Sequence, residues 1–119
     1  MNVTNTEMRF LEIIWEHEPL SSRSLVEYCN IIFGWKKSTT YTMLRRMEEK
    51  GILQNDESVV RTLIAKEEIQ KSESRNVIDG KFNGSLPSFL TAFLSSNRIS
   101  DEEYEEICSI IESYRKNQK

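Results

Sequence analysis

Three short amphipathic segments in the first 50 residues constrain this chain more than any other feature of its sequence. Apolar side chains recur three and four residues apart in 5–18, in 22–33 and in 38–50, which is the spacing of one buried helix face. Each segment is followed by a proline or a glycine, and both residues end helices. The pattern predicts three helices, and the N-terminal caps that we expect are Thr4 or Asn5, Ser21 or Ser22, and Ser38 or its neighbour.

Two β-prone segments follow the third predicted helix. Residues 52–54 and 59–64 are rich in Ile, Leu and Val, and the turn-forming stretch 55–58 separates them. A two-stranded hairpin alone is marginal in water, so it needs the surface of the three helices to pack on. This order predicts a mainly α fold of the winged helix-turn-helix type. Residues 1–65 would form a DNA-binding domain of three helices and a β-hairpin wing.

The remaining residues, 66–119, read as a helical dimerisation region. Residues 66–84 predict a polar connecting helix and a loop, because Gly80 and Gly84 interrupt the segment. Two amphipathic helices follow, with Ser85 and Ser100 as expected caps. Their apolar faces would cover a second copy of the chain or, alternatively, fold back on their own chain, and we favour the homodimer. The side chains assigned to dimerisation are Leu86, Phe89, Leu90, Phe93, Leu94, Tyr104, Ile107, Ile111 and Tyr114.

Composition argues against several classes of function. The 119 residues contain no apolar run of about 18 residues and no basic-then-apolar leader, so we expect a cytoplasmic protein without a membrane partner. Cys29 and Cys108 are far apart and His17 is the only histidine, so zinc binding and histidine catalysis lack the necessary residues. The sequence shows no nucleophile–base pair and no phosphate-binding glycine loop. We therefore expect neither an enzyme nor a cofactor or metal site.

Positive charge is concentrated in one part of this chain, whose net charge is −3. Residues 35–71 carry eight basic and six acidic side chains, whereas residues 1–34 carry two and five. A local basic cluster can neutralise phosphates on an acidic protein, because the attraction acts over about one Debye length, roughly 8 Å at physiological salt. The cluster indicates either a nucleic-acid contact or a solvated helix face.

One face of the segment 38–50 carries hydroxyls and guanidiniums, and the other carries apolar residues. Such a helix suits the major groove when its N-terminal end enters first, because Glu48 and Glu49 at the far end repel phosphates. The expected partner is a double-stranded DNA operator. We assign Lys36, Lys37 and Arg46 to phosphates and Ser38, Thr39, Tyr41, Thr42 and Arg45 to the groove. Arg61 on the second wing strand would reach a flanking phosphate or, equally, be an ordinary surface residue.

Two motifs resemble a known family. Glu7-x-x-Phe10-x-x-x-Ile14-Trp15 and Thr39-x-x-Thr42-x-x-x-Arg46-x-x-x-Lys50-Gly51 resemble the penicillinase-repressor and methicillin-resistance-repressor family, which includes copper-transport repressors. The stretch 82–103 resembles the dimerisation region of that family. The resemblance implies a homodimer on a palindromic operator that represses antibiotic-resistance, copper or related stress genes. It also implies that the main DNA contacts lie in the third helix, at Ser38, Thr39, Tyr41 and Thr42.

The chain departs from the family pattern at three places. Members that respond to β-lactams are cleaved at an Asn-Phe bond, and Ala92-Phe93 stands at the matching position. Copper-responsive members carry a cysteine cluster where Cys108 stands alone, and residues 59–62 replace the usual aromatic wing strand. Because of these departures, the resemblance does not carry over cleavage at Ala92-Phe93 or the copper site. It still implies a regulatory protease or sensor protein as a further partner. The competing hypothesis is a winged-helix protein-interaction module, which predicts no salt-dependent DNA binding.

Overall fold

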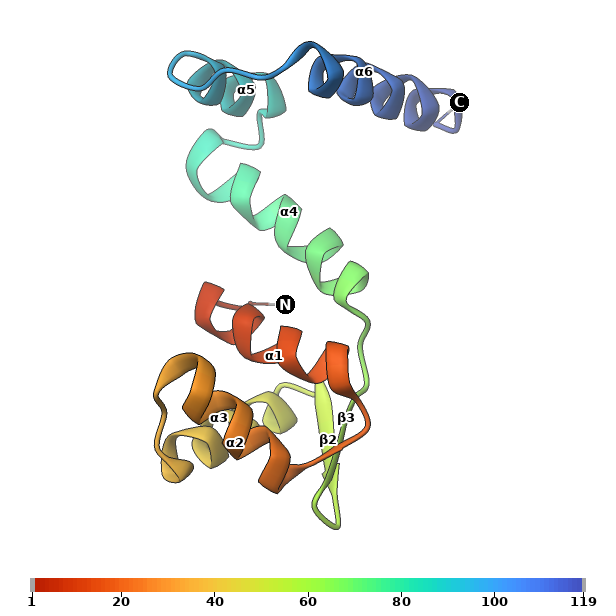
Figure 1. Cartoon of the computed structure of the whole chain (residues 1–119). Coiled ribbons are helices and arrows are strands. Elements are labelled where there is room, and N and C mark those ends of the chain that lie inside the picture. The colour runs from red at the N-terminus through yellow and green to blue at the C-terminus, as the bar shows by residue number, and fades with distance from the viewer. Residues whose placement is uncertain (1, 119) are drawn as a thin grey trace. The chain divides into compact units, whose positions relative to one another are not determined.

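The computed structural model describes residues 2–118 and divides into two compact units, Met1–Asn76 and Val77–Lys119. The first unit contains three helices, a small sheet and the start of a fourth helix (Figure 1). This is the winged helix-turn-helix order that the sequence predicts. Its elements are α1 (Asn5–His17), β1 (Leu20–Ser21), α2 (Ser22–Phe33), α3 (Lys37–Glu49), β2 (Leu53–Asp56), β3 (Val59–Thr62) and α4 (Lys66–Phe82).

The first two helices begin at side-chain caps that the sequence predicts. The Thr4 hydroxyl accepts a hydrogen bond from the Glu7 amide at 3.1 Å, and the Glu7 carboxylate accepts one from the Thr4 amide at 3.0 Å. This reciprocal pair is a capping box, which satisfies two amides that a helix leaves without partners. Ser21 caps α2 by accepting from the Ser24 amide at 3.0 Å. Gly34 ends α2 in the left-handed conformation, with φ of 71°.

The cap expected at Ser38 is wrong. Lys36 occupies the N-cap position of α3 without a side-chain cap, and Ser38 already lies inside the helix. Trp35 lies in the turn before α3, where its ring is tilted against Phe33 with centroids 4.7 Å apart and stacks on Phe10 at 6.0 Å. Because this aromatic packing sets the turn, the N-cap of α3 lies two residues before Ser38.

The sheet contains one strand that the sequence did not reveal. Its order is β1-β3-β2 and all its pairs are antiparallel. Leu20 lies opposite Val60, so the two-residue strand β1 joins α1 and α2 to the predicted hairpin. Glu57 and Ser58 form the hairpin turn with positive φ angles of 49° and 66°, as a two-residue turn of type I′ requires. The strands therefore extend further into the predicted turn than their polar residues suggest.

One hydrophobic core fills the first unit. Side chains from α1, α2, α3, the hairpin and α4 meet there, and the indole of Trp15 at its margin donates a hydrogen bond to the Ile64 carbonyl at 3.1 Å. Burial raises the pKa of the Cys29 thiol, which stays in its neutral form in the core. The fully buried side chains include Phe10, Leu11, Ile14, Leu25, Leu44, Met47, Ile52, Val60 and Ile69.

The predicted break at Gly80 is also wrong. α4 continues through Gly80 to Phe82 and ends where Asn83 and Gly84 adopt positive φ angles of 52° and 76°. A single glycine costs a helix only about 1 kcal/mol, which neighbouring turns can offset. α4 begins at the predicted boundary between residues 65 and 66, yet its first turns belong to the first unit, because Ile69 is fully buried there.

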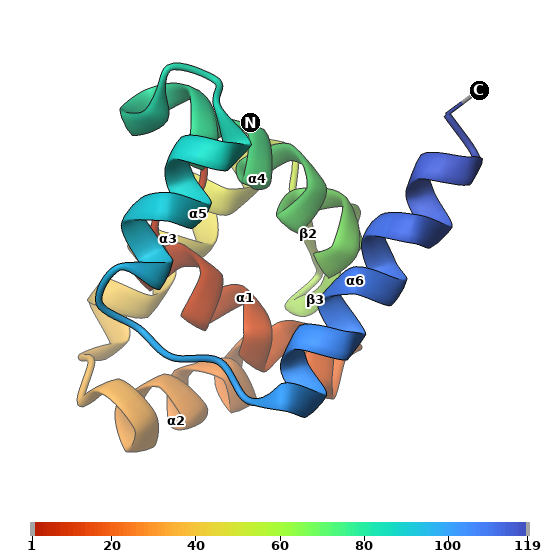
Figure 2. The ribbon, with the colours of Figure 1, turned by 90° about the horizontal axis from the view of Figure 1, so that it is seen from above.

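The second unit comprises the end of α4, α5 (Leu86–Leu94) and α6 (Asp101–Lys116). Ser85 and Ser100 cap the two helices through the amides of Ser88 and Glu103, at 3.1 and 3.0 Å. Within the described part of the unit, α5 and α6 do not pack along each other (Figures 1 and 2). Phe89 lies between Phe82 and Phe93, with ring centroids 5.3 and 6.2 Å away.

None of the described residues 77–118 is buried. The side chains predicted to pack at a dimer interface are therefore uncovered or only half covered in the single chain. Phe89 and Ile107 are half-buried, and the rest are exposed, namely Leu86, Leu90, Phe93, Leu94, Tyr104, Ile111 and Tyr114.

Candidate nucleic-acid interface

The two long faces of α3 differ sharply in exposure. Thr40, Met43, Leu44 and Met47 are buried against the core, as their helical spacing predicts. The opposite face is open to solvent and presents hydroxyls and positive charges together. Its exposed residues are Lys37, Ser38, Thr39, Thr42, Arg45 and Arg46, with Lys36 directly before the helix.

Tyr41 stands at the edge of this exposed face rather than on it. The side chain is half-buried, and its hydroxyl donates a hydrogen bond to Ser22 Oγ at 3.3 Å. The ammonium group of Lys37 lies 5.9 Å from the centre of its ring. Tyr41 therefore ties α3 to the start of α2 and brings a positive charge to the margin of the exposed face.

A shallow groove of about 210 Å³ runs along the exposed face of α3. The Thr42 hydroxyl donates to the Ser38 carbonyl at 2.9 Å, which leaves its oxygen able to accept a further hydrogen bond. The groove thus offers hydroxyl oxygens beside a guanidinium, a combination that suits base edges and phosphates. It is lined by Ser38, Thr39, Thr42, Met43 and Arg46.

The positive charges of α3 fall into two groups. Arg46 and Lys50 share the buried carboxylate of Glu7, at 3.7 and 2.8 Å. Burial raises the pKa of Glu7, but the hydrogen bonds from Lys50 and Thr4 and the two nearby positive charges lower it more. The net pKa lies below its ordinary value, so the carboxylate is ionised at neutral pH. Within the part of the chain that the structure describes, Lys36, Lys37 and Arg45 form no ion pair.

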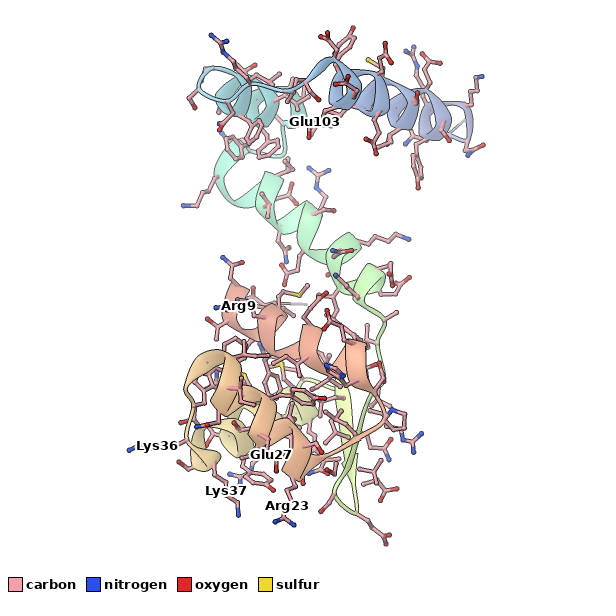
Figure 3. The ribbon with its side chains drawn as sticks, in the orientation of Figure 1. Arg9, Arg23, Glu27, Lys36, Lys37 and Glu103 are labelled. Carbon is pink, nitrogen blue, oxygen red and sulfur yellow. The ribbon has the colours of Figure 1, made fainter. Side chains whose placement is uncertain are left out.

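Arg23 is a basic residue near this face that the sequence did not single out. It lies on the first turn of α2, in a stretch of the sequence with an acidic balance. A groove of about 540 Å³ separates it from Lys37, between α2, α3 and the wing turn at Ser58. Figure 3 shows Arg23, Lys36 and Lys37 reaching outward at one edge of the first unit. Only the packing of α2 on α3 brings these charges together, so no local sequence signal could have revealed Arg23.

The wing contributes one exposed positive charge, Arg61 on β3, whose backbone pairs with Gln54. No group of three or more candidate metal ligands occurs among residues 2–118. None of the helices in this described range is long and apolar enough to cross a membrane.

Comparison with known proteins places the sequence of this chain among repressors. The family model for the penicillinase repressor matches residues 3–113. The penicillinase repressor of Bacillus licheniformis is 25% identical over 98% of this chain and 94% of its own length. The methicillin resistance regulatory protein MecI of Staphylococcus aureus is 24% identical over 92% of each chain.

One solved structure supports the fold of the first unit. The solution structure of the DNA-binding domain of the repressor BlaI superposes with a TM-score of 0.51 at 22% identity, over 55% of this chain and 84% of that domain. The helices, the small sheet and the buried core of the first unit agree with a winged-helix domain. Because the family match extends over nearly the whole chain, this protein belongs to the penicillinase repressor family, a family of transcriptional repressors.

Proposed function

We propose that this chain represses transcription as a homodimer, with α3 of each copy lying in the major groove of a palindromic operator. The observation that supports this most strongly is the exposed hydroxyl-and-guanidinium face of α3, backed by a buried apolar face. The buried face packs the helix against the core, and the exposed face is open to a duplex. In this proposal the N-terminal end of α3 enters the groove first.

Each exposed side chain has a role in the proposal. Lys36, Lys37 and Arg46 bind phosphates, and Arg61 on the wing binds a flanking phosphate. These contacts position the protein, whereas contacts with base edges determine the sequence that is bound. The side chains proposed to face the groove are Ser38, Thr39, Thr42 and Arg45, with Tyr41 at its margin.

The homodimer is supported by the exposed apolar faces of α5 and α6. Phe93 and Leu94 are 45% and 47% exposed on one helix, and Ile111 is 52% exposed on the other. An apolar surface of this kind on a small protein is a candidate for self-association. A symmetric dimer would then bind half-sites whose centres are about 10 base pairs apart, or a multiple of that spacing.

The proposal includes a sensor or regulatory protease that acts on the second unit. Ala92 and Phe93 are both exposed on α5, so the bond between them lies at the surface of the unit. A cut at this bond would separate the end of α5 and all of α6 from the DNA-binding unit, and with them six of the nine side chains assigned to the dimer surface. Mass spectrometry of the chain isolated after induction would locate the cut, and an intact chain would remove the protease from the proposal.

The test is a binding titration with the duplex that lies upstream of the gene for this chain, at several salt concentrations. A DNA-binding protein loses affinity steeply as salt rises. Arg45→Ala should cost about 1–3 kcal/mol on the specific duplex and relax the preference at one base position. Lys37→Ala should weaken all duplexes alike and reduce the slope of log affinity against log salt by about 1.

Lys81→Ala, which removes an exposed positive charge from the end of α4, is the matched control and should change neither quantity. Binding that is absent, or that does not depend on salt, would reject the proposal in favour of a protein-interaction module.

A further inference from the structure

Glu7 is a buried carboxylate placed directly behind the exposed face of α3. Its side chain is only 3% exposed, although it comes from the first turn of α1. Lys50 donates to Glu7 Oε1 at 2.8 Å and to the Asn2 carbonyl at 2.7 Å, so the ammonium group is fixed on two sides. The Thr4 amide donates to the same carboxylate oxygen at 3.0 Å. Lys50 and the cap therefore already satisfy the Oε1 atom of this carboxylate.

Arg46 is the second positive charge at Glu7, and it differs from Lys50 in its exposure. Its guanidinium lies 3.7 Å from Glu7 Oε2 while 52% of its side chain remains exposed. The same side chain lines the shallow groove along α3 with Ser38, Thr39 and Thr42. One carboxylate thus faces two positive charges, which leaves a net charge of +1 at the cluster. Because Lys50 is the closer partner, the exposed side of Arg46 can still meet an anion outside the protein.

We propose that Glu7 is a positioning residue for DNA recognition, which holds the guanidinium of Arg46 at the edge of the α3 groove for a backbone phosphate. This inference rests on the proposed function. An arginine whose side chain is held before binding loses less conformational freedom when the duplex arrives. A guanidinium that stays beside Glu7 also meets a phosphate best in the register in which the groove residues meet their bases. Glu7 therefore raises the affinity for the operator relative to random DNA, although it contacts neither duplex.

The variant Glu7→Gln tests this role because it removes the charge and keeps the cap. Glutamine is as suitable as glutamate at this position of a capping box, so α1 should still begin at Thr4. We expect the ratio of affinities for the upstream duplex and for a shuffled duplex of the same length and composition to fall roughly fivefold, the size typical of coupled neighbours. The loss should come from weaker binding to the upstream duplex, with equal or tighter binding to the shuffled one.

A double-mutant cycle separates positioning from a merely structural role. If Glu7 acts through Arg46, then Glu7→Gln combined with Arg46→Ala should lower the affinity ratio no further than Arg46→Ala alone. Effects that add in full, in variants with native circular dichroism, would overturn the proposal. Glu12→Gln is the matched control, because Glu12 lies on the same helix but pairs with Lys66 at 2.7 Å. It removes the same charge and should leave the ratio unchanged.

A second variant keeps the test decisive if Glu7→Gln does not fold. Glu7→Gln with Lys50→Met removes the closest ion pair together, so no buried charge is left without a partner. Arg46 again loses its anchor, and the same roughly fivefold fall is expected. A ratio equal to that of the original chain in this folded variant would overturn the inference alone. An original chain without salt-dependent DNA binding would instead overturn the proposed function.

Discussion

The two units of this chain differ in how far their apolar side chains are buried. Among the described residues of the first unit, fourteen hydrophobic side chains are buried in one core, and among the described residues 77–118 none is buried. Yet the helices of both units carry apolar side chains at the same three- and four-residue spacing. Amphipathic spacing therefore predicts a helix with an apolar face, and does not predict what covers that face. Four changes to the chain or its conditions test how far this difference between the units extends.

The largest effect should follow truncation of the first core. Phe10 is fully buried and stacks on Trp35, so Phe10→Ala should lower the free energy of unfolding by about 3–5 kcal/mol. Chemical denaturation monitored by tryptophan fluorescence measures this, because both tryptophans lie in the first unit. Phe93→Ala in the second unit should leave that transition in place. Equal losses from both variants would mean that the units unfold as one.

The second effect should appear when charge is placed on the exposed apolar faces. Phe93→Asp with Ile111→Asp should convert the proposed dimer to a monomer, because two negative charges would have to be buried at its interface. Affinity for the upstream duplex should then fall about a hundredfold or more, since two linked half-sites bind as one. Sedimentation and a binding titration measure the two effects. Thr91→Asp with Ser109→Asp adds the same charge away from these faces and should preserve the dimer.

The third effect concerns acid, which should destabilise the first unit through Glu7. The pKa of Glu7 in the folded chain lies below its ordinary value of 4.5. Its ionised form therefore stabilises the fold fully above about pH 4.5, and this contribution is lost as pH falls through the lower, folded pKa. Glu7→Gln should lower the free energy of unfolding by about 1.5–3 kcal/mol at pH 7 and by less at low pH. Denaturation midpoints of both proteins, measured from pH 7 to low pH, provide the measurement. A difference in stability that does not change with pH would contradict the prediction.

The smallest effects should come from two glycines with opposite signs. Gly51 has φ of 77° and open space around the missing side chain, so Gly51→Ala should cost about 1 kcal/mol through backbone strain alone. Gly80 lies inside α4 with no positive φ and equally open space, so Gly80→Ala should stabilise the helix by about 1 kcal/mol. Amide exchange in α3 and in the end of α4 would report each change. Changes in stability of the same sign for Gly51→Ala and Gly80→Ala would contradict this prediction.

Much of the first unit could be predicted from local sequence because local rules produce it. Helical spacing identified α1, α2 and α3, and the caps at Thr4 and Ser21 followed from polar residues at the right offset. The buried and exposed faces of α3 also followed from spacing. The cap expected at Ser38 failed because the aromatic packing of Trp35 overrides a local preference, and the break expected at Gly80 failed because one glycine is a weak signal.

Local sequence is enough to predict which residues form helices and which face of α3 packs against the core, since both follow from spacing along one segment. Which charged side chains meet depends on the packing of the helices and strands, because the partners lie far apart in the chain. Strand β1 forms because Leu20 and Ser21 pair with β3. Arg23 lies at the same edge of the first unit as Lys36 and Lys37, although it comes from another helix. Glu7 forms its ion pair with Lys50, which is 43 residues away in the chain. Contacts between distant segments depend on how elements pack, and that packing is not encoded in any local pattern.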